Sequence, residues 1–242
     1  MQEKENEGFA KPIIKKELIV SLPGRELTFH IAADIEALIT DVNDEDKVPC
    51  WADVWPASYG MAYFIWDTVD FSPGEKVLEL GAGMGLPGIV SALKGAKLTL
   101  SDFNPTALEM AGQNARLNGI EAVLLQEDWR VFASKEKYDY ILASDICYDP
   151  KLNYFLGKIF LNNLKPGGKV IISHHDRKAT KMFIKEWFEQ NSVNFQQETY
   201  MRQVVLADAL LPRYDIVINI LQSSPAKRVR REASMVKQFN TM

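Results

Sequence analysis

Short apolar runs alternate with helical patterns along most of the chain after Phe71, and this alternation constrains the fold more than any other feature. The runs are KVLEL (76–80), KLTLS (97–101), AVLLQ (122–126), YDYILA (138–143) and KVIIS (169–173). Strands that are buried on both faces read as continuous apolar runs, and helical crossovers between them make neighbouring strands parallel. We therefore predict an α/β domain with helices on both faces of a parallel sheet.

Two more strand-like runs, at 192–201 and 213–221, follow the helical pattern around 178–190 with no helix of similar length between them. Strands joined in this way pair antiparallel, so we expect a hairpin at the edge of the sheet. The predicted fold is a Rossmann-like, seven-stranded, mostly parallel sheet with an antiparallel C-terminal strand hairpin.

The N-terminal part carries two elements of its own. Residues 13–32 contain two β-rich runs around a Pro23-Gly24 turn, which predicts a β-hairpin. Residues 50–70 form an aromatic segment, and its Pro56 suits the first turn of a helix.

We expect one main domain rather than two, because a chain of 242 residues with 47% hydrophobic residues can bury a sizeable core. The predicted single domain spans 13–222, and its Rossmann-like core spans 75–221. Residues 1–12 are charged and predicted to be disordered, and 223–242 are predicted to be a flexible basic tail. The tail's basic cluster consists of Lys227, Arg228, Arg230 and Arg231.

The net charge of −4 and a pI near 5.5 argue against broad electrostatic binding to nucleic acid. The two cysteines and three scattered histidines have no spacing typical of a metal site, so we expect no structural metal. No apolar stretch is long enough to span a membrane and the first residues do not resemble a secretory leader, so we expect a cytoplasmic protein.

A glycine-rich loop, GAGMGLPG, follows the first strand of the predicted sheet directly. Glycines at this point let the backbone turn tightly and approach a bound cofactor. Two patterns compete within it. Residues 83–88 spell G-x-G-x-x-G, with Asp102 near the spacing of a ribose-binding acid in dinucleotide-binding enzymes. Residues 79–85 spell E-x-G-x-G-x-G, which begins where the strand ends.

The second pattern is similar to the first motif of class I, seven-β-strand S-adenosylmethionine-dependent methyltransferases. This resemblance covers about residues 50 to 221. It implies S-adenosyl-L-methionine as cofactor and S-adenosyl-L-homocysteine as product. It places Asp102 at the ribose hydroxyls, and Asp128 and Trp129 at the adenine amine and ring. The cofactor-binding set that we infer is Glu79, Gly81, Gly83, Gly85, Asp102, Phe103, Asn104, Asp128, Trp129 and Ser144.

These residues also have structural explanations. Asp102 can cap the turn before Asn104, Trp129 can be a core aromatic, and Glu79 can be a buried acid bonded to backbone N–H groups. Tyr154 and Lys158 match the Y-x-x-x-K spacing of short-chain dehydrogenases. We interpret that match as chance, because the glycine pattern of those enzymes is absent from the N-terminus.

The segment SDICYDP follows the fourth parallel strand, beside the predicted cofactor crevice. Its Asp145 and Tyr148 have the D-x-x-Y spacing of amino-methylating enzymes, although Ile146 and Cys147 replace the usual prolines. The closer resemblance is to the family 16 protein-lysine methyltransferases, which carry D-x-x-Y here and a WAxxWP segment before the glycine loop. By that resemblance Trp55 contacts the cofactor.

We therefore predict an N-methyltransferase with Asp145 and Tyr148 as catalytic residues and a protein lysine as acceptor. Asp145 can instead be a strand-end acid and Tyr148 a cover for the sheet edge, while Asp149 and Pro150 open the next helix. His174 and His175 can line the acceptor side or simply end a strand. Two other functions stay open: a small-molecule N-methyltransferase acting on a pyridine or amine, and a non-catalytic scaffold that binds the cofactor.

Overall fold

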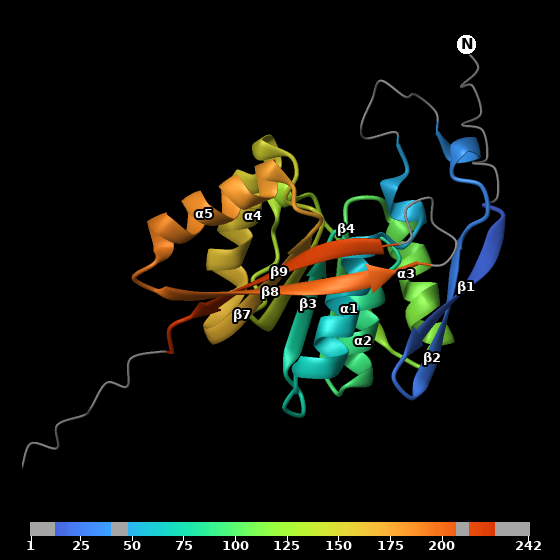
Figure 1. Ribbon diagram of the computed structural model, residues 1–242, viewed down its shortest axis with the longest axis horizontal. Helices are drawn as coiled ribbons and strands as arrows, with labels where there is room; N and C mark the ends of the chain where they lie inside the picture. Colours follow the sequence, from blue (N-terminus) through green and yellow to red (C-terminus); the bar gives the residue numbers. More distant parts are fainter. Residues whose placement is uncertain (1–12, 40–47, 207–212, 226–242) are drawn as a thin grey trace, which may run out of the picture.

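One mixed sheet of seven strands, in the order β5-β4-β3-β6-β7-β9-β8, forms the centre of the molecule (Figure 1). The computed structural model describes residues 13–39, 48–206 and 213–225. The predicted disordered N-terminus (1–12) and the basic cluster of the tail (227–231) lie outside the described residues. Among the described helices, none is long and apolar enough to cross a membrane.

The strands of this sheet confirm the five predicted parallel runs and the C-terminal hairpin. The strands are β3 (Lys76–Leu80), β4 (Lys97–Asp102), β5 (Ala122–Gln126), β6 (Tyr138–Ser144), β7 (Leu164–His174), β8 (Phe195–Val205) and β9 (Arg213–Ser223). β9 lies between β7 and β8 and is antiparallel to both. The hairpin therefore continues the sheet at one edge.

Helices cover both faces of the sheet, as predicted. They are α1 (Pro56–Thr68), α2 (Leu86–Leu93), α3 (Pro105–Leu117), α4 (Pro150–Asn163) and α5 (Lys178–Asn191). α1, α2 and α3 lie on one side of the sheet and α4 and α5 on the other (Figure 1). Two hydrophobic cores result, one on each face. Successive residues of β6 divide between them: Leu142 packs toward α1, whereas Ile141 and Ala143 pack toward α4.

The helix starts follow the local chemistry of the sequence. Asn104 caps α3, because its side-chain oxygen accepts hydrogen bonds from the backbone N–H groups of residues 106 and 107. Asp149 caps α4 in the same way. α1 begins at Pro56, as the sequence predicts, and the short 3-10 helix η3 (Cys50–Ala52) precedes it.

The N-terminal hairpin forms a separate two-stranded sheet of β1 (Lys15–Leu22) and β2 (Arg25–Ala32). It lies beside α3 in Figure 1, and side chains of α3 hold its backbone. Asn114 Oδ1 accepts from the N–H of His30 at 2.8 Å, and Asn118 Oδ1 accepts from the N–H of Thr28 at 3.2 Å. The hairpin therefore adds a layer outside α3. The apolar side chains of the hairpin belong to the same hydrophobic core as those of α1, α2 and α3.

Candidate functional site

The carboxyl ends of five parallel strands lie at one edge of the sheet, and the candidate residues follow these ends. In spatial order the strands are β5, β4, β3, β6 and β7. In open α/β sheets, ligands bind in the crevice outside this edge, where the strand order changes direction. Here the chain runs from β3 outward to β4 and β5, and then crosses back to β6 on the other side of β3. The glycine loop after β3 is therefore at the switch point.

The loop's first three glycines all have left-handed backbone conformations. Their φ values are +58° at Gly81, +51° at Gly83 and +80° at Gly85, a region that other residues enter only with strain. Space is restricted as well. A Cβ at Gly81 would lie 2.8 Å from Cγ2 of Ile146 and 3.1 Å from Cζ2 of Trp129. The loop thus brings the residues that follow β5 and β6 to the end of β3.

Glu79 lies beneath the loop, with only 1% of its surface exposed. Its Oε2 accepts a hydrogen bond of 2.9 Å from the backbone N–H of Gly88, in α2. A Cβ at Gly88 would lie 2.5 Å from that oxygen, so a glycine is required there. The last glycine of the G-x-G-x-x-G pattern is thereby explained by the packing of Glu79, with no need for a bound pyrophosphate.

Asp102 ends β4 and joins the loop to the next helix. Its Oδ2 accepts a 3.0 Å hydrogen bond from the N–H of Gly83, and its Oδ1 accepts a 2.9 Å bond from the N–H of Asn104. Asp102 therefore does cap the turn before α3, and each carboxylate oxygen keeps a further lone pair for a ligand. Phe103, beside it, is exposed.

Two buried carboxyls under the loop have raised pKa values. Burial raises the pKa of Glu79 from 4.5 to about 8, the N–H of Gly88 opposes this shift, and the charge of Asp102 adds to it. Burial also raises the pKa of Asp102, while N–H groups of the loop and turn lower it. The floor of the site thus has a charge that depends on pH.

The aromatic segment before α1 packs on the same loop. A Cβ at Gly83 would lie 3.5 Å from the backbone oxygen of Trp51. Trp55 is the residue before α1, and its indole N–H donates to the carbonyl of Cys50. Its side chain is exposed. The WAxxWP segment therefore lies at the loop, and its second tryptophan is accessible to a ligand.

Asp128 and Trp129 follow β5, at the start of the 3-10 helix η4 (Trp129–Val131). Both carboxylate oxygens of Asp128 pair with Arg130, and this pairing lowers the pKa of Asp128. Trp129 packs against Gly81. The indole Nε1 of Trp129 is buried and has no hydrogen-bond partner among the described residues. Such an unpartnered donor beside a glycine loop is suited to an acceptor atom of a ligand.

Ser144 ends β6 and takes part in a serine cluster. Its Oγ lies 3.1 Å from Oγ of Ser58 in α1 and 3.1 Å from Oγ of Ser173 in β7. Ser173 also donates to the carbonyl of Ala57. Ser144 therefore connects two strands with the start of α1, and the structure shows a structural role for it.

Asp145 is held in a specific position directly after β6. Its φ of +52° is left-handed, and its N–H donates to the carbonyl of Ser173 at 2.8 Å. Its carboxylate accepts two hydrogen bonds from Arg177, from Nε at 2.8 Å and from a terminal nitrogen at 3.0 Å. The same guanidinium lies 5.9 Å from the ring centre of Tyr148. Asp145 and Tyr148 thus come together around one cation.

Arg177 is the residue of this site that sequence reasoning missed. It lies just before α5, after the end of β7. Its position after the strand next to β6 is the signal that identifies it, because the ends of adjacent parallel strands converge.

The two histidines lie in different surroundings. His174 is fully buried, its Nε2 lies 3.2 Å from the side-chain nitrogen of Asn219 in β9, and burial lowers its pKa. His175 is exposed and packs edge-on against Tyr214.

Tyr154 and Lys158 both lie on α4. The ammonium group of Lys158 is 4.3 Å from the ring centre of Tyr154, a contact along a helix surface. Of the described residues, no group of three or more His, Cys, Asp or Glu is arranged to hold a metal ion.

Comparison with known proteins places the chain in a family. A sequence profile of the lysine methyltransferase family matches residues 36–191. A histone-arginine methyltransferase, METTL23, of Rattus norvegicus is 36% identical over 105 residues, which is 40% of this chain and 47% of that protein. EEF1A lysine methyltransferase 3 of Mus musculus is 37% identical over 115 residues, 45% of this chain and 49% of that protein. The matched region spans about half the length of each of these relatives.

Solved structures share the fold at low sequence identity. The 16S rRNA N2 methyltransferase RsmC of T. thermophilus, in complex with AdoMet and guanosine, has a TM-score of 0.60 at 17% identity, covering 93% of this chain and 54% of that one. The N-methyltransferase NodS of Bradyrhizobium japonicum, in complex with S-adenosyl-L-homocysteine, has a TM-score of 0.53 at 15% identity, covering 78% and 96%. Because the family profile matches more than half of the residues, the chain belongs to the lysine methyltransferase family.

Proposed function

We propose that the chain is an S-adenosylmethionine-dependent N-methyltransferase and that its acceptor is a lysine side chain of a protein. The observation that carries this proposal is the position of Asp145. Its carboxylate holds a cation beside Tyr148, and its neighbour Ile146 packs against the glycine loop. A carboxylate paired with Arg177, beside an exposed tyrosine, thus adjoins the candidate cofactor site.

The residues around the loop fit the cofactor. Asp102 has free lone pairs for ribose hydroxyls, and Trp129 offers an aromatic face and an unpartnered indole N–H. We assign further contacts to Trp55, Phe103, Asn104 and Asp128. Glu79 and Ser144 act through the loop and the strand ends that they hold. When bound, the cofactor supplies an electrophilic methyl group on sulfur, and S-adenosylhomocysteine is the product.

The acceptor amine must be neutral to attack, although a lysine in water has a pKa of about 10.4. A lone carboxylate beside the amine would favour the ammonium form and raise that pKa. Arg177 offsets this effect, because its positive charge compensates Asp145. Asp145 still has lone pairs with which to orient the amine. In this mechanism Asp145 positions the nitrogen, and Arg177 keeps the local charge near zero.

Exposure at the site supports a large acceptor. Tyr148 is 49% exposed, whereas the Asp145 side chain is only 12% exposed. A mostly buried carboxylate beside an exposed tyrosine suits a long side chain that arrives from a protein surface. We also propose the cytoplasm as the compartment, in agreement with the reduced state expected of Cys50 and Cys147.

Two measurements test the proposal. S-adenosylhomocysteine at a hundred times its dissociation constant should stabilise the fold by about 2.7 kcal/mol, measured by thermal unfolding. In a cell lysate with radiolabelled cofactor, label should enter a protein band and appear as methyllysine after hydrolysis. A thermal shift with NADH alone would contradict the cofactor assignment.

The lysate experiment also separates the alternatives. Label only in the low-mass fraction would indicate a small-molecule acceptor. Label recovered as methylarginine or methylhistidine would keep the enzyme class and overturn the acceptor residue. Cofactor binding without transfer to any fraction would support the non-catalytic scaffold.

A further inference from the structure

The connection from β5 to β6 differs from the other crossovers of the sheet. β3 and β4 are joined through α2, β4 and β5 through α3, and β6 and β7 through α4. Between β5 and β6 the chain forms only the short η4 and an irregular segment that reaches residue 137. Parallel strands are usually joined by a helix, which covers the sheet. Here only the short η4 and the irregular segment lie beside α4 on this side, in place of an α-helix.

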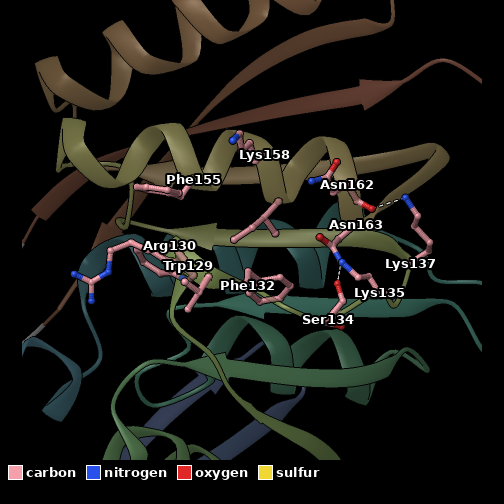
Figure 2. Close-up of a pocket in the computed structure, with 12 residues that line it drawn as sticks. Trp129, Arg130, Phe132, Ser134, Lys135, Lys137, Phe155, Lys158, Asn162 and Asn163 are labelled. Atoms are coloured by element: carbon pink, nitrogen blue, oxygen red, sulfur yellow. Dashed lines mark hydrogen bonds between the residues drawn. The ribbon is translucent and has the colours of Figure 1, made fainter.

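A groove of about 740 Å³ lies between this connection and α4 (Figure 2). Four cationic side chains line it: Arg130, Lys135, Lys137 and Lys158. No Asp or Glu is among its lining residues. In a chain with a net charge of −4, a groove whose charged lining residues are all cationic is a local reversal of sign.

Most of these four positive charges have no carboxylate partner among the described residues. Lys137 donates to the carbonyl oxygen of Asn162, and Lys158 lies over the ring of Tyr154, and both partners are neutral. Lys135 makes no ion pair with any residue in the described ranges. Arg130 alone of the four pairs with a carboxylate, that of Asp128. The groove therefore carries excess positive charge.

The groove combines cationic side chains at its ends with aromatic side chains between them. Figure 2 shows Arg130 at one end and Lys135 and Lys137 at the other, with the rings of Phe132 and Phe155 between them. Along α4 it runs from Phe155 to residue 163, a helical rise of about 12 Å. Three or four residues of extended chain span that length.

We propose that this groove docks a protein partner through a short extended segment with carboxylates at both ends and an aromatic or aliphatic side chain between them. Charge complementarity and the central phenylalanine rings select this occupant. A nucleic acid fits less well, because the acidic molecule as a whole repels a long polyanion. Trp129, which is assigned to the cofactor, lines one end of the groove, but none of the residues assigned to the amine lines it. Docking can therefore be tested without methyl transfer.

Fluorescence anisotropy with labelled peptides tests the proposal on the full chain. The probe is an eight-residue peptide whose first two and last two residues are acids. Phenylalanine and leucine are among the four residues between them. The comparison peptide has Asn and Gln in place of the acids. We expect the acidic peptide to bind about tenfold more tightly, with affinity that falls as salt rises. Equal affinity for the two peptides would overturn the proposal.

A charge-reversal variant locates the binding. Lys135→Glu with Lys158→Glu should weaken the acidic peptide about tenfold. The control, Lys16→Glu with Lys185→Glu, makes the same change in net charge on exposed lysines of β1 and α5 and should change affinity less than twofold. Equal losses in both variants would show a general charge effect and contradict a groove.

Two further readouts complete the test. Hydrogen exchange with bound peptide should show protection in 129–137 and 155–163, and protection confined to other segments would overturn the site. A single-stranded RNA of eight nucleotides should bind more weakly than the acidic peptide. Tighter binding of the RNA, lost in the Lys135→Glu, Lys158→Glu variant, would assign the groove to nucleic acid instead.

Discussion

Arg177 holds the carboxylate of Asp145 through two parallel hydrogen bonds, of 2.8 and 3.0 Å, across a sequence separation of 32 residues. The planar fork of a guanidinium matches a carboxylate in this way, and the pair is strong because both partners are charged. The hydrogen bonds to Asp145 raise the pKa of Arg177, so the guanidinium stays protonated. Its effect is on whichever cation or amine approaches Asp145 next.

Replacement of Arg177 by Gln should change the pH dependence of methyl transfer. Without the guanidinium, the negative charge of Asp145 stabilises the ammonium form of the acceptor and raises its pKa. The acidic limb of kcat, which reports groups in the bound complex, should therefore move upward by about one pH unit. Lys178→Gln removes a neighbouring charge that, within the described residues, forms no ion pair with Asp145, and it should leave the limb in place. An unshifted limb in Arg177→Gln would contradict the charge-compensation mechanism.

Replacement of Asp145 by Asn should lower kcat/KM by about a hundredfold or more, while affinity for S-adenosylhomocysteine changes less than twofold. Asn tolerates the left-handed backbone at this position, so the variant should fold. Asp149→Ala is the matched control, since it removes the cap of α4 at a cost of about 1 kcal/mol and should keep activity. Activity retained in Asp145→Asn would remove this residue from the mechanism.

Much of the fold was predictable because its signals are local. Each buried parallel strand is a continuous apolar run, and Asn104 and Asp149 mark helix starts by short-range hydrogen bonds. The glycine loop was equally visible, because three alternate left-handed positions demand glycine in the sequence itself. These features need no knowledge of distant residues.

The rest depends on contacts between distant segments. The pairing of Asp145 with Arg177 arises only because β6 and β7 are adjacent, and no pattern in either segment encodes it. Packing of the Trp51 backbone on Gly83 depends in the same way on how α1 docks. The assignment of site residues to the cofactor remains a prediction that the binding experiments address.

Replacement of Gly81 by Ala should weaken cofactor binding in addition to lowering the stability of the fold. The new Cβ would press on Ile146 and on Trp129, the ring assigned to the adenine. Gly119→Ala is the control, because Gly119 is also left-handed, at φ +75°, with nothing within 4 Å of its Cβ position. Both variants should lose roughly 1–2 kcal/mol of stability from backbone strain. Measured by calorimetry, only Gly81→Ala should lower the affinity for S-adenosylhomocysteine, by about tenfold. Equal affinities of the Gly81→Ala and Gly119→Ala variants would argue against a cofactor at Trp129.

Glu79 should make the free energy of unfolding depend on pH. Its pKa is about 8 in the folded chain, chiefly because of burial, against 4.5 in an unfolded one. The folded state therefore binds more protons between these values, and the contribution that is present below pH 4.5 is lost as pH rises through 8. Urea unfolding at pH 5, 6, 7 and 8 should show stability falling by a few kcal/mol. In Glu79→Gln, which can still accept from Gly88, the decline should largely disappear, whereas the exposed control Glu121→Gln should retain it. A decline of the same slope in Glu79→Gln would assign the titration to another group.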